Sequence, residues 1–509
     1  MNLGIDFGTT RTVVAQSDRG NYPVVTFFDG SGAAAEYYPT VLAEREGQLR
    51  FGFDALEAAR EPGWTLVRSF KRFLGQKGVT PSHVVRLGSS DHALGDVVTG
   101  FLASLRHALV NASNAPSLKD GEALRAFVST PAHALGPQRF LTLDAFRRAG
   151  FEVRGLLNEP SAAGFEYTHR YRKTLTAQRD QVLVYDLGGG TFDAALVRMH
   201  AQAHDVVATR GLGTLGGDDF DDVLAAMVVR GLGKKQPALS PEQSAALALR
   251  ARDAKEALTP NSRRVVVDLE GLGLLKTEFS AVATDYYDAC LPLVDQTLDA
   301  CSALLPDEDE SGALAGLYVV GGASALPVVA RRLKEVYGRR VHRSPYPSAA
   351  IAMGLAIAGD DEAGYELSDR LSRTFGVFRE ARGGQDVSFD EIFGRDERLP
   401  GAKALGRAVR RVYRAAHNVG CYRFVEANEL DDRGLPRAGL HTFGDVTFAF
   451  DPTLRDHDTR LNDVPVRRLS GRGPLVQEEY RVSELGLVEV ALTDLDTGYA
   501  RTFTLGAQS

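Results

Sequence analysis

The sequence predicts an α/β fold for residues 1–360, followed by a mostly β sandwich. Two observations predict the first part: short apolar strand-like segments alternate with helix-like segments, and one strand–turn–strand unit occurs twice. A third observation predicts the second part, because beyond Asp360 apolar residues alternate with polar ones between tight turns. With 509 residues the chain is too long for one compact core, so we expect two or three domains.

The α/β prediction rests on short apolar segments that are each followed by glycine or proline. The strand candidates are Asn2–Asp6, Arg125–Ser129, Gln181–Asp186 and Gly316–Val320. The helix candidates are Gln138–Ala149, Asp218–Val229, Pro241–Ala257 and Pro327–Tyr337. Strands that alternate with helices favour mainly parallel sheets with helices on their faces.

The repeated unit is a strand, a glycine turn and a second strand. The segment GIDFGTTRTVVA begins at Gly4, and YDLGGGTFDAAL begins at Tyr185. Two copies of one unit, about half a domain apart, predict an internal duplication with two similar lobes that face each other. We place lobe I at about 1–172 and 340–360, and lobe II at about 173–339.

The second part begins after an acidic break. Acidic residues at 360–362 predict a linker at about 361–374. Beyond it, apolar residues alternate with other residues at 446–450 and again at 488–492. Such alternation between tight turns predicts antiparallel strands in a sandwich over 375–509.

Composition and charge exclude several classes of protein. Hydrophobic residues make up 44% and charged residues 25% of the chain, as in ordinary soluble proteins, and a net charge of −7 makes a nucleic-acid partner unlikely. Cys290, Cys301 and Cys421 form no CxxC pair, which argues against a zinc site or a disulfide framework. The first strand follows no signal peptide, and no uncharged apolar run reaches roughly 18 residues. We therefore expect a cytoplasmic protein without a membrane partner.

The two glycine turns carry groups that can hold phosphate. Glycine lets backbone N–H groups approach phosphate oxygens closely, and a threonine hydroxyl can donate to the same oxygens. Asp6 and Asp186 end the first strands, where carboxylates can hold the water shell of Mg²⁺. Either turn alone could be only a tight hairpin, but two with a matching Asp and Thr predict a clamp for one Mg–nucleotide. A third turn, at 321–323, precedes a helix and suits a purine, ribose or phosphate contact.

These three motifs, in this order and at this spacing, resemble the DnaK-type heat-shock-seventy chaperones over residues 1–360. Further segments resemble the family's catalytic-lysine stretch, its proline switch, its lobe connection, its phosphate-reaching segment and its last crossing helix: Ser69–Gly75, Val128–Arg139, Asn158–Ala163, Leu215–Phe220 and Pro347–Gly359. The resemblance implies a two-lobed actin-like (ribonuclease-H-like) ATPase domain.

The resemblance also implies residue roles. Lys71 would act on the γ-phosphate and the attacking water, Asp6, Glu159 and Asp186 would arrange the waters of Mg²⁺, and Thr191 and Asp193 would contact the γ-phosphate and an ion. The implied catalytic residues are Lys71, Glu159, Asp186, Thr191 and Asp193. The implied nucleotide contacts are Asp6, Gly8, Thr9, Thr10, Gly188, Gly189, Gly190, Thr191, Gly216, Gly217, Asp218, Lys255, Gly321, Gly322 and Ala323.

The same resemblance implies cofactors and partners. The cofactors are ATP or ADP and Mg²⁺, with K⁺ as a candidate second ion. The partners are an unfolded polypeptide or protein client, a J-domain co-chaperone and a nucleotide exchange factor. Together these imply a chaperone-like protein that slowly hydrolyses ATP and couples its nucleotide state to binding of a client.

The sequence departs from the family at the adenosine end of the expected site. Ala325 stands where the family has an arginine near the adenine, and Ser348 replaces an aspartate. In the helix that keeps Lys255, Arg252 and Glu256 stand where the family often has glutamate and arginine. Phosphate handling is therefore expected to be intact, whereas adenosine affinity is expected to differ.

Residues 375–509 resemble the family's peptide-binding sandwich more weakly. We expect no helical lid beyond Leu505, and weak coupling because Leu367–Leu371 replaces the family's leucine-rich linker. The apolar spacing over 405–413 suggests a helix, but the resemblance favours a strand there. A basic stretch fits a solvated sandwich face better than an acidic partner or nucleic acid; it contains Arg395, Arg398, Lys403, Arg407, Arg410, Arg411, Arg414 and Arg423.

Two other functions stay open at this point. The same superfold includes small-molecule kinases, and fold does not fix function. A nucleotide-gated scaffold with negligible turnover is the second alternative. A dinucleotide-binding reading of the GxGxxG at 211–216 is disfavoured, because no acidic residue closes a second strand about 20 residues later.

Overall fold

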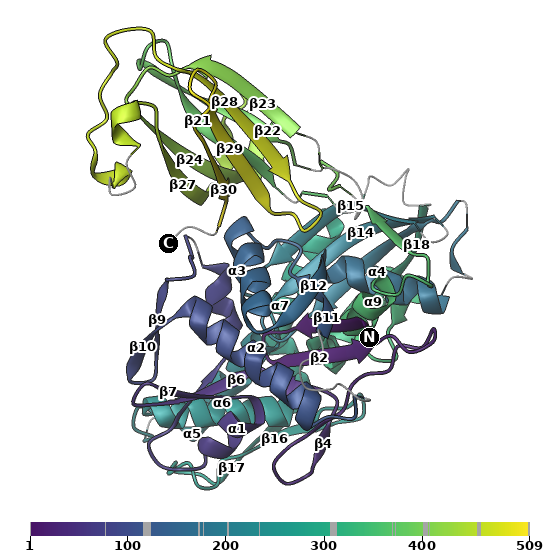
Figure 1. The fold of residues 1–509 in the computed structure, drawn as a ribbon. Coiled ribbons are helices and arrows are strands. Elements are labelled where there is room, and N and C mark those ends of the chain that lie inside the picture. Colours follow the sequence, from purple (N-terminus) through teal and green to yellow (C-terminus); the bar gives the residue numbers. More distant parts are fainter. Residues whose placement is uncertain are drawn as a thin grey trace.

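The computed structural model describes residues 2–76, 78–115, 124–171, 174–176, 178–200, 203–233, 235–305, 313–368, 370–371, 373–395, 397–400, 406, 408–455 and 460–506. Two α/β lobes lie next to each other, and a β-sandwich sits at one end of them (Figure 1). The predicted fold class, an α/β part followed by a mostly β sandwich, is confirmed.

The first lobe is built on a five-stranded sheet of order β12-β11-β1-β2-β5. Its strands are β1 (Asn2–Phe7), β2 (Arg11–Gln16), β5 (Tyr38–Pro39), β11 (Leu124–Thr130) and β12 (Phe151–Asn158). Side chains alternate between its two faces. Val14 faces the core formed with α2 (Leu94–Asn111) and α3 (Gly136–Arg148), whereas Val13 and Ala15 face the core formed with α4 (Glu159–Tyr171) and α9 (Ala350–Ala358).

The second lobe is built on a six-stranded sheet of order β19-β18-β13-β14-β15-β20. Its strands are β13 (Gln181–Leu187), β14 (Phe192–His200), β15 (Ala203–Leu212), β18 (Leu314–Val320), β19 (Val341–Arg343) and β20 (Glu366–Ser368). One core lies between this sheet and α5 (Gly217–Leu232), α7 (Ala283–Ser302) and α8 (Pro327–Tyr337). Val182 and Val184 face the core that contains α4 and α9. These two helices therefore pack between the sheets and join the lobes.

The predicted strands and helices all occur, but the expectation of mainly parallel sheets is wrong. β1 pairs parallel with β11 and antiparallel with β2, and β13 likewise pairs parallel with β18 and antiparallel with β14. The reason is the repeated unit itself, because a tight glycine turn can join only antiparallel strands. β19 pairs with β18, so residues 341–343 belong to the second sheet although 340–360 were assigned to lobe I.

Smaller elements lie around the two sheets. In the first lobe they are β3 (Phe27–Phe28), β4 (Ala34–Ala35), β6 (Val41–Arg45), β7 (Gln48–Phe51), α1 (Gly52–Ala58), β8 (Thr65–Arg68), the 3₁₀ helix η1 (Phe70–Gly75), β9 (Val84–Leu87) and β10 (Ser90–Ala93). In the second lobe they are α6 (Pro241–Glu256), β16 (Arg264–Asp268), β17 (Glu278–Val282), and the 3₁₀ helices η4 (Gly322–Ala325) and η5 (Gly338–Arg340).

The sandwich consists of two antiparallel four-stranded sheets, β22-β21-β24-β27 and β23-β28-β29-β30. Its strands are β21 (Thr374–Ala381), β22 (Asp386–Phe393), β23 (Ala408–Arg414), β24 (Val419–Ala427), β27 (His441–Ala449), β28 (Leu475–Val482), β29 (Val488–Asp494) and β30 (Ala500–Thr504). A short ribbon of β25 (Glu429–Leu430) and β26 (Pro436–Ala438) and the 3₁₀ turns η6 (Pro452–Leu454) and η7 (Leu461–Asp463) complete it. β23 confirms the strand over 408–413; Leu405 lies outside the described residues.

The basic stretch is paired within the protein. Its described arginines contact acceptors of the same chain: Arg395 with the Asn428 carbonyl, Arg398 with Asp205, Arg410 with Glu479, Arg411 with Asp390, Arg414 with Asp496 and Arg423 with Asp445. Lys403 and Arg407 lie outside the described residues. This pairing favours the solvated face over a site for an acidic partner.

The predicted linker contains a strand. β20 pairs parallel with the edge strand β15, so residues 366–368 extend the second sheet. Arg370 and Arg398 both contact Asp205 on β15. The sandwich reaches the first lobe through Glu426, which accepts a hydrogen bond from Gly136 N at 3.1 Å. Across the residues that the structure describes, no helix combines the length and apolarity needed to cross a membrane.

Candidate functional site

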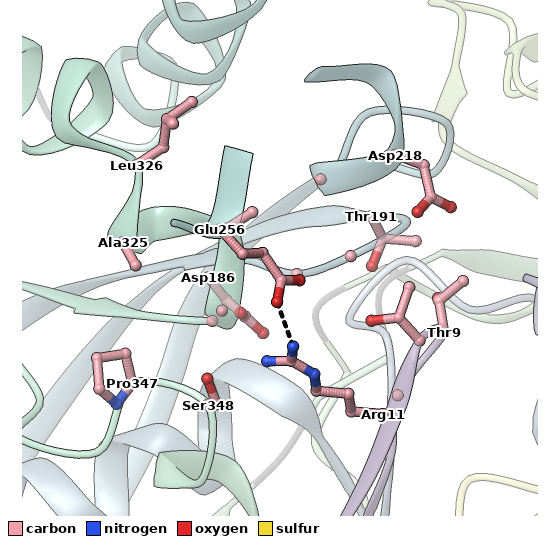
Figure 2. A pocket seen from close by; sticks show the side chains of 18 of the residues that line it. Thr9, Arg11, Asp186, Thr191, Asp218, Glu256, Ala325, Leu326, Pro347 and Ser348 are labelled. Atoms are coloured by element: carbon pink, nitrogen blue, oxygen red, sulfur yellow. Dashed lines mark hydrogen bonds and ion pairs between the residues drawn. The ribbon is translucent and has the colours of Figure 1, made fainter. Parts of the chain in front are cut away.

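A cleft of about 260 Å³ opens between the two lobes, and both lobes contribute to its walls (Figure 2). The two glycine turns face each other and meet at its floor. Phe7 pairs with Thr12, and Leu187 pairs with Phe192, so the two hairpins have the same length. This equality agrees with the repeat in the sequence.

The tips of the hairpins approach so closely that only glycine fits on one side. A Cβ on Gly189 would lie 2.5 Å from Thr10 Oγ1, and a Cβ on Gly190 would lie 2.6 Å from Thr9 Cγ2. Both distances are far below van der Waals contact. The threonines of one lobe and the glycines of the other therefore form a single, continuous floor of hydroxyl and backbone groups.

Lys71 supplies a buried positive charge at this floor. It lies on η1, and its Nζ is 3.3 Å from Glu159 Oε1 and 5.2 Å from the centroid of the Phe7 ring. Burial raises the pKa of Glu159 to about 7; the nearby Lys71 charge opposes this rise, while Asp6 adds to it. The cleft therefore holds a carboxyl group that can gain or lose a proton near neutral pH.

Two further carboxyl groups stand beside this pair. Burial raises the pKa of Asp6, although Lys71 and the hydrogen bond from Ser129 Oγ at 3.0 Å oppose the rise. Burial and repulsion from Glu159 raise the pKa of Asp186 well above its ordinary value. Asp186 Oδ1 is buried and has no hydrogen-bond partner among the residues that the structure describes. Carboxyl groups crowded in this way favour the binding of a cation.

No cage for a directly ligated metal is built from these groups. Within the described ranges, no three His, Cys, Asp or Glu side chains are grouped closely enough to hold an ion by themselves. The carboxyl groups fit a hard cation that keeps its waters, because such an ion needs only outer oxygen acceptors.

The second lobe packs a helix start onto its own hairpin. Gly217 N donates to the Gly188 carbonyl at 2.9 Å, and Asp218 N donates to the Gly189 carbonyl at 2.8 Å. Lys255 holds the same helix from the other side, with its Nζ 2.7 Å from the Gly217 carbonyl and 2.6 Å from Asp221 Oδ1. The start of α5 is thereby fixed next to the glycine floor.

The third predicted turn also reaches the cleft. Gly321 has φ of 84°, a left-handed conformation, and a Cβ there would lie 2.4 Å from Asp186 Oδ1. Only glycine suits both the backbone and the contact. This turn thus places Gly322 and Ala323 on the cleft wall beside Asp186.

Most of the residues expected from the sequence line this one cleft. They are Asp6, Gly8, Thr9, Thr10, Lys71, Glu159, Asp186, Gly188, Gly189, Thr191, Gly217, Asp218, Lys255, Gly321, Gly322 and Ala323.

Gly190, Gly216 and Asp193 are not among the lining residues. Gly190 and Gly216 pack against each other, since a Cβ on Gly216 would lie 2.6 Å from the Gly190 carbonyl carbon. Asp193 is buried behind the hairpin, where its Oδ1 accepts from Ala132 N at 3.0 Å and lies 2.9 Å from His133 Nδ1.

Sequence reasoning gave no role to a charged group at the mouth of the cleft. Arg11 Nη2 donates to Glu256 Oε2 at 2.5 Å (Figure 2). Arg252 Nε donates to Glu256 Oε1 at 3.0 Å. Arg252 and Glu256 were noticed only as departures from the family. The available signal for Arg11 is its place directly after Thr10, at the start of β2.

Comparison with known proteins identifies relatives. The sequence model of the family described as "Hsp70 protein" matches residues 102–371. The chain is similar to a "Chaperone protein HscA homolog" of Acidovorax sp. (strain JS42), with 31% identity over 432 residues, 79% of this chain and 65% of the relative. A protein of the same description from Burkholderia ambifaria (strain MC40-6) is 33% identical over 430 residues, and "Chaperone protein HscA" of Enterobacter sp. (strain 638) is 30% identical over 423. Both alignments cover 79% of this chain and 65% of the relative.

The chain thus spans about 65% of the length of the curated relatives it matches. The family model covers more than half of the chain, and the two lobes with the following sandwich have the actin-like architecture that the resemblance implied. The chain belongs to the Hsp70 family.

Proposed function

We propose that this protein binds Mg–ATP in the cleft, hydrolyses it to ADP and phosphate, and uses the nucleotide state to control binding of a polypeptide by the sandwich. One observation carries the proposal: two equivalent glycine hairpins meet at the floor of a cleft that also holds the buried Lys71–Glu159 pair. Phosphoryl transfer needs mainly positioning and charge neutralisation, and this arrangement supplies both.

The hairpins hold the phosphates. Backbone N–H groups of the turns at 8–10 and 188–191 donate to phosphate oxygens, together with the hydroxyls of Thr9, Thr10 and Thr191. Asp6 and Asp186 would hold Mg²⁺ through its waters, and the ion when bound would neutralise phosphate charge. Gly322 and Ala323 contact the nucleoside.

Lys71 and Glu159 carry out the hydrolysis. The Lys71 ammonium stabilises the negative charge that builds on the γ-phosphoryl oxygens as the bond to ADP breaks. The Glu159 carboxylate orients the attacking water and accepts its proton, for which its pKa of about 7 is well matched. Asp193 acts from behind the hairpin, where it holds His133 and the Ala132 amide in place.

The sandwich is proposed to bind the client, in a domain that starts after the linker at 361–374. Two connections lead from the cleft to it. β20 places the linker on the second sheet, and Arg373 Nη2 donates to the carbonyl of His133, whose ring contacts Asp193. A J-domain co-chaperone and a nucleotide exchange factor are proposed partners by virtue of the family.

A single-turnover assay with limiting Mg–ATP tests the function. The full chain is expected to release free phosphate, and phosphate transfer to an added sugar would support the kinase alternative instead. Lys71→Ala is expected to bind Mg–ATP but to hydrolyse it roughly 100-fold more slowly or worse, because it loses a charge aimed at the transition state. Lys334→Ala, which removes an exposed lysine on α8, is the control and is expected to keep the wild-type rate. Equal rates in Lys71→Ala and wild type would contradict the proposal.

A further inference from the structure

An arginine on the strand that follows the first phosphate turn places its planar, positively charged group in the cleft. Arg11 begins β2, directly after Thr9 and Thr10, and its side chain lines the cleft (Figure 2). None of the steps proposed above uses it. The residue is nevertheless held firmly, which is unusual for an arginine at the edge of a cleft, because a free arginine side chain has many rotamers.

Two contacts fix the guanidinium of Arg11. Its central carbon lies 4.7 Å from the centroid of the Tyr37 ring, and Nη2 bonds Glu256 at 2.5 Å. Glu256 is itself held by Arg252, and only 28% of the Arg11 side chain is exposed. Tyr37 covers one face of the guanidinium, and Glu256 holds one edge. The other face therefore remains available as a rigid plane.

The opposite wall gives a nucleobase little to stack on. Ala325 presents only a methyl group, and Pro347 lines the same end of the cleft with aliphatic carbon (Figure 2). None of the described lining residues is aromatic. A base bound here therefore needs a planar partner from another part of the cleft. Two arginines line it: Arg252 on α6, whose Nε is bound to Glu256, and Arg11 from the other lobe, which also stacks on Tyr37.

Resting on the proposed nucleotide binding, we propose that Arg11 is the base-stacking residue of this site, with the nucleobase on the guanidinium face opposite Tyr37. The β1–β2 hairpin then holds the nucleotide at both ends, by phosphate contacts at Thr9 and Thr10 and by stacking at Arg11. Every base has a π face, so stacking favours the larger purines without distinguishing adenine from guanine.

Calorimetric titration of the full chain separates stacking from charge. The ligands are Mg–ATP, Mg–GTP and Mg–tripolyphosphate, which has no base. Arg11→Ala is expected to weaken both nucleotides roughly 3- to 30-fold, and to leave tripolyphosphate within about twofold. Arg11→Lys keeps the charge but not the plane, so it is not expected to restore nucleotide affinity.

A matched control is available in the same lobe. Arg45 stacks on Trp64 at 4.5 Å and does not line the cleft, so Arg45→Ala removes an arginine–aromatic stack without touching the site. This variant is expected to bind all three ligands like wild type. Unchanged melting temperatures of the variants would show that they are folded.

Each of the following results would overturn the inference. If Arg11→Ala loses as much affinity for tripolyphosphate as for the nucleotides, or if Arg11→Lys binds the nucleotides like wild type, then Arg11 acts as a positive charge that binds phosphate. If Arg252→Ala loses affinity for the nucleotides but not for tripolyphosphate, and Arg11→Ala does not, then Arg252 is the base-stacking residue. If wild type binds Mg–ATP and Arg11→Ala binds it equally, this inference alone fails; if wild type binds no Mg–ATP, the proposed function fails with it.

Discussion

Glu159 is the residue whose charge decides what the cleft can do near neutral pH. It is buried beside Lys71, and burial raises its pKa to about 7 even though the lysine opposes the rise. The ionised form can accept a proton from water, whereas the protonated form cannot. A group that titrates near the working pH is well suited to general-base catalysis.

This pKa predicts how ATP hydrolysis depends on pH. Below about pH 7 the cleft binds a proton at Glu159 and loses its base, so kcat/KM is expected to fall roughly tenfold per pH unit and to level off above that pH. Glu159→Gln is expected to be slow throughout, without a break near pH 7. Steady-state kcat/KM between about pH 5.5 and 8.5 measures this, because it reports the pKa of the free protein. A break near pH 7 that persists in Glu159→Gln would assign the titration to another group.

The sequence identifies some of these residues better than others. Thr9, Thr10 and the facing glycines follow from the chemistry of a repeated turn. Lys71 does not follow from this chemistry, because a lysine beside Arg72 is also typical of a solvated basic pair. Only the resemblance to the family identifies Lys71. Neither argument identifies Arg11, because its role depends on Glu256, which lies 245 residues away in sequence.

Among the elements, the glycine hairpins were predicted best because their pattern is local. A strand, a glycine turn and a second strand specify one another over about a dozen residues. The sheets around them were predicted less well. Whether β1 pairs parallel or antiparallel with each neighbour depends on where β11 arrives from, far along the chain, and no local pattern encodes this.

The sandwich contains a buried charge cluster that alternation alone did not reveal. Glu478 on β28 is fully buried, and both of its oxygens accept from Arg379 of the opposite sheet, at 3.0 and 2.6 Å. The hydroxyls of Tyr413 and Tyr480 each donate to it at 2.6 Å. This cluster ties the two sheets together with charge in a place where a sandwich core is ordinarily apolar.

Removing one charged partner of this cluster is expected to lower the free energy of unfolding of the sandwich. Arg379→Met leaves Glu478 buried without its countercharge, so it is expected to destabilise the sandwich by about 3–5 kcal/mol. The double variant with Glu478→Leu is expected to recover much of this loss, because no buried charge is left unpaired. Urea unfolding of the full chain, followed by the near-ultraviolet circular dichroism of its tyrosines, measures the change.

The turn after β21 offers a control for this prediction. Arg382 pairs with Asp386 on the surface, and 81% of its side chain is exposed. Exposed pairs contribute roughly 1 kcal/mol or less, so Arg382→Met is expected to leave the unfolding midpoint nearly unchanged. Similar losses in the two single variants would show that Glu478 does not depend on Arg379.

Across the whole chain, the sandwich is attached to the lobes by apolar and polar contacts, because Leu485 and Leu487 of the sandwich pack into the core of the first lobe. Burial raises the pKa of Glu426 to about 7 at this interface, where its carboxyl accepts from Gly136 N. His133 connects the region behind the cleft to Arg373 in the linker. Burial lowers the pKa of His133, but the charge of Asp193 outweighs it and the pKa is raised. No sequence pattern predicts these contacts, because each joins surfaces that come together only in the folded chain.

In the proposed function, one Mg–nucleotide is clamped by both hairpins at once. Amide hydrogen exchange of the full chain, measured by mass spectrometry over a series of Mg–ATP concentrations, tests this clamp. Peptides that contain residues 8–11 and 188–191 are expected to become protected together, with the same midpoint, because both turns donate to one ligand. Protection of only one hairpin, two different midpoints, or no protection at saturating Mg–ATP would contradict the account.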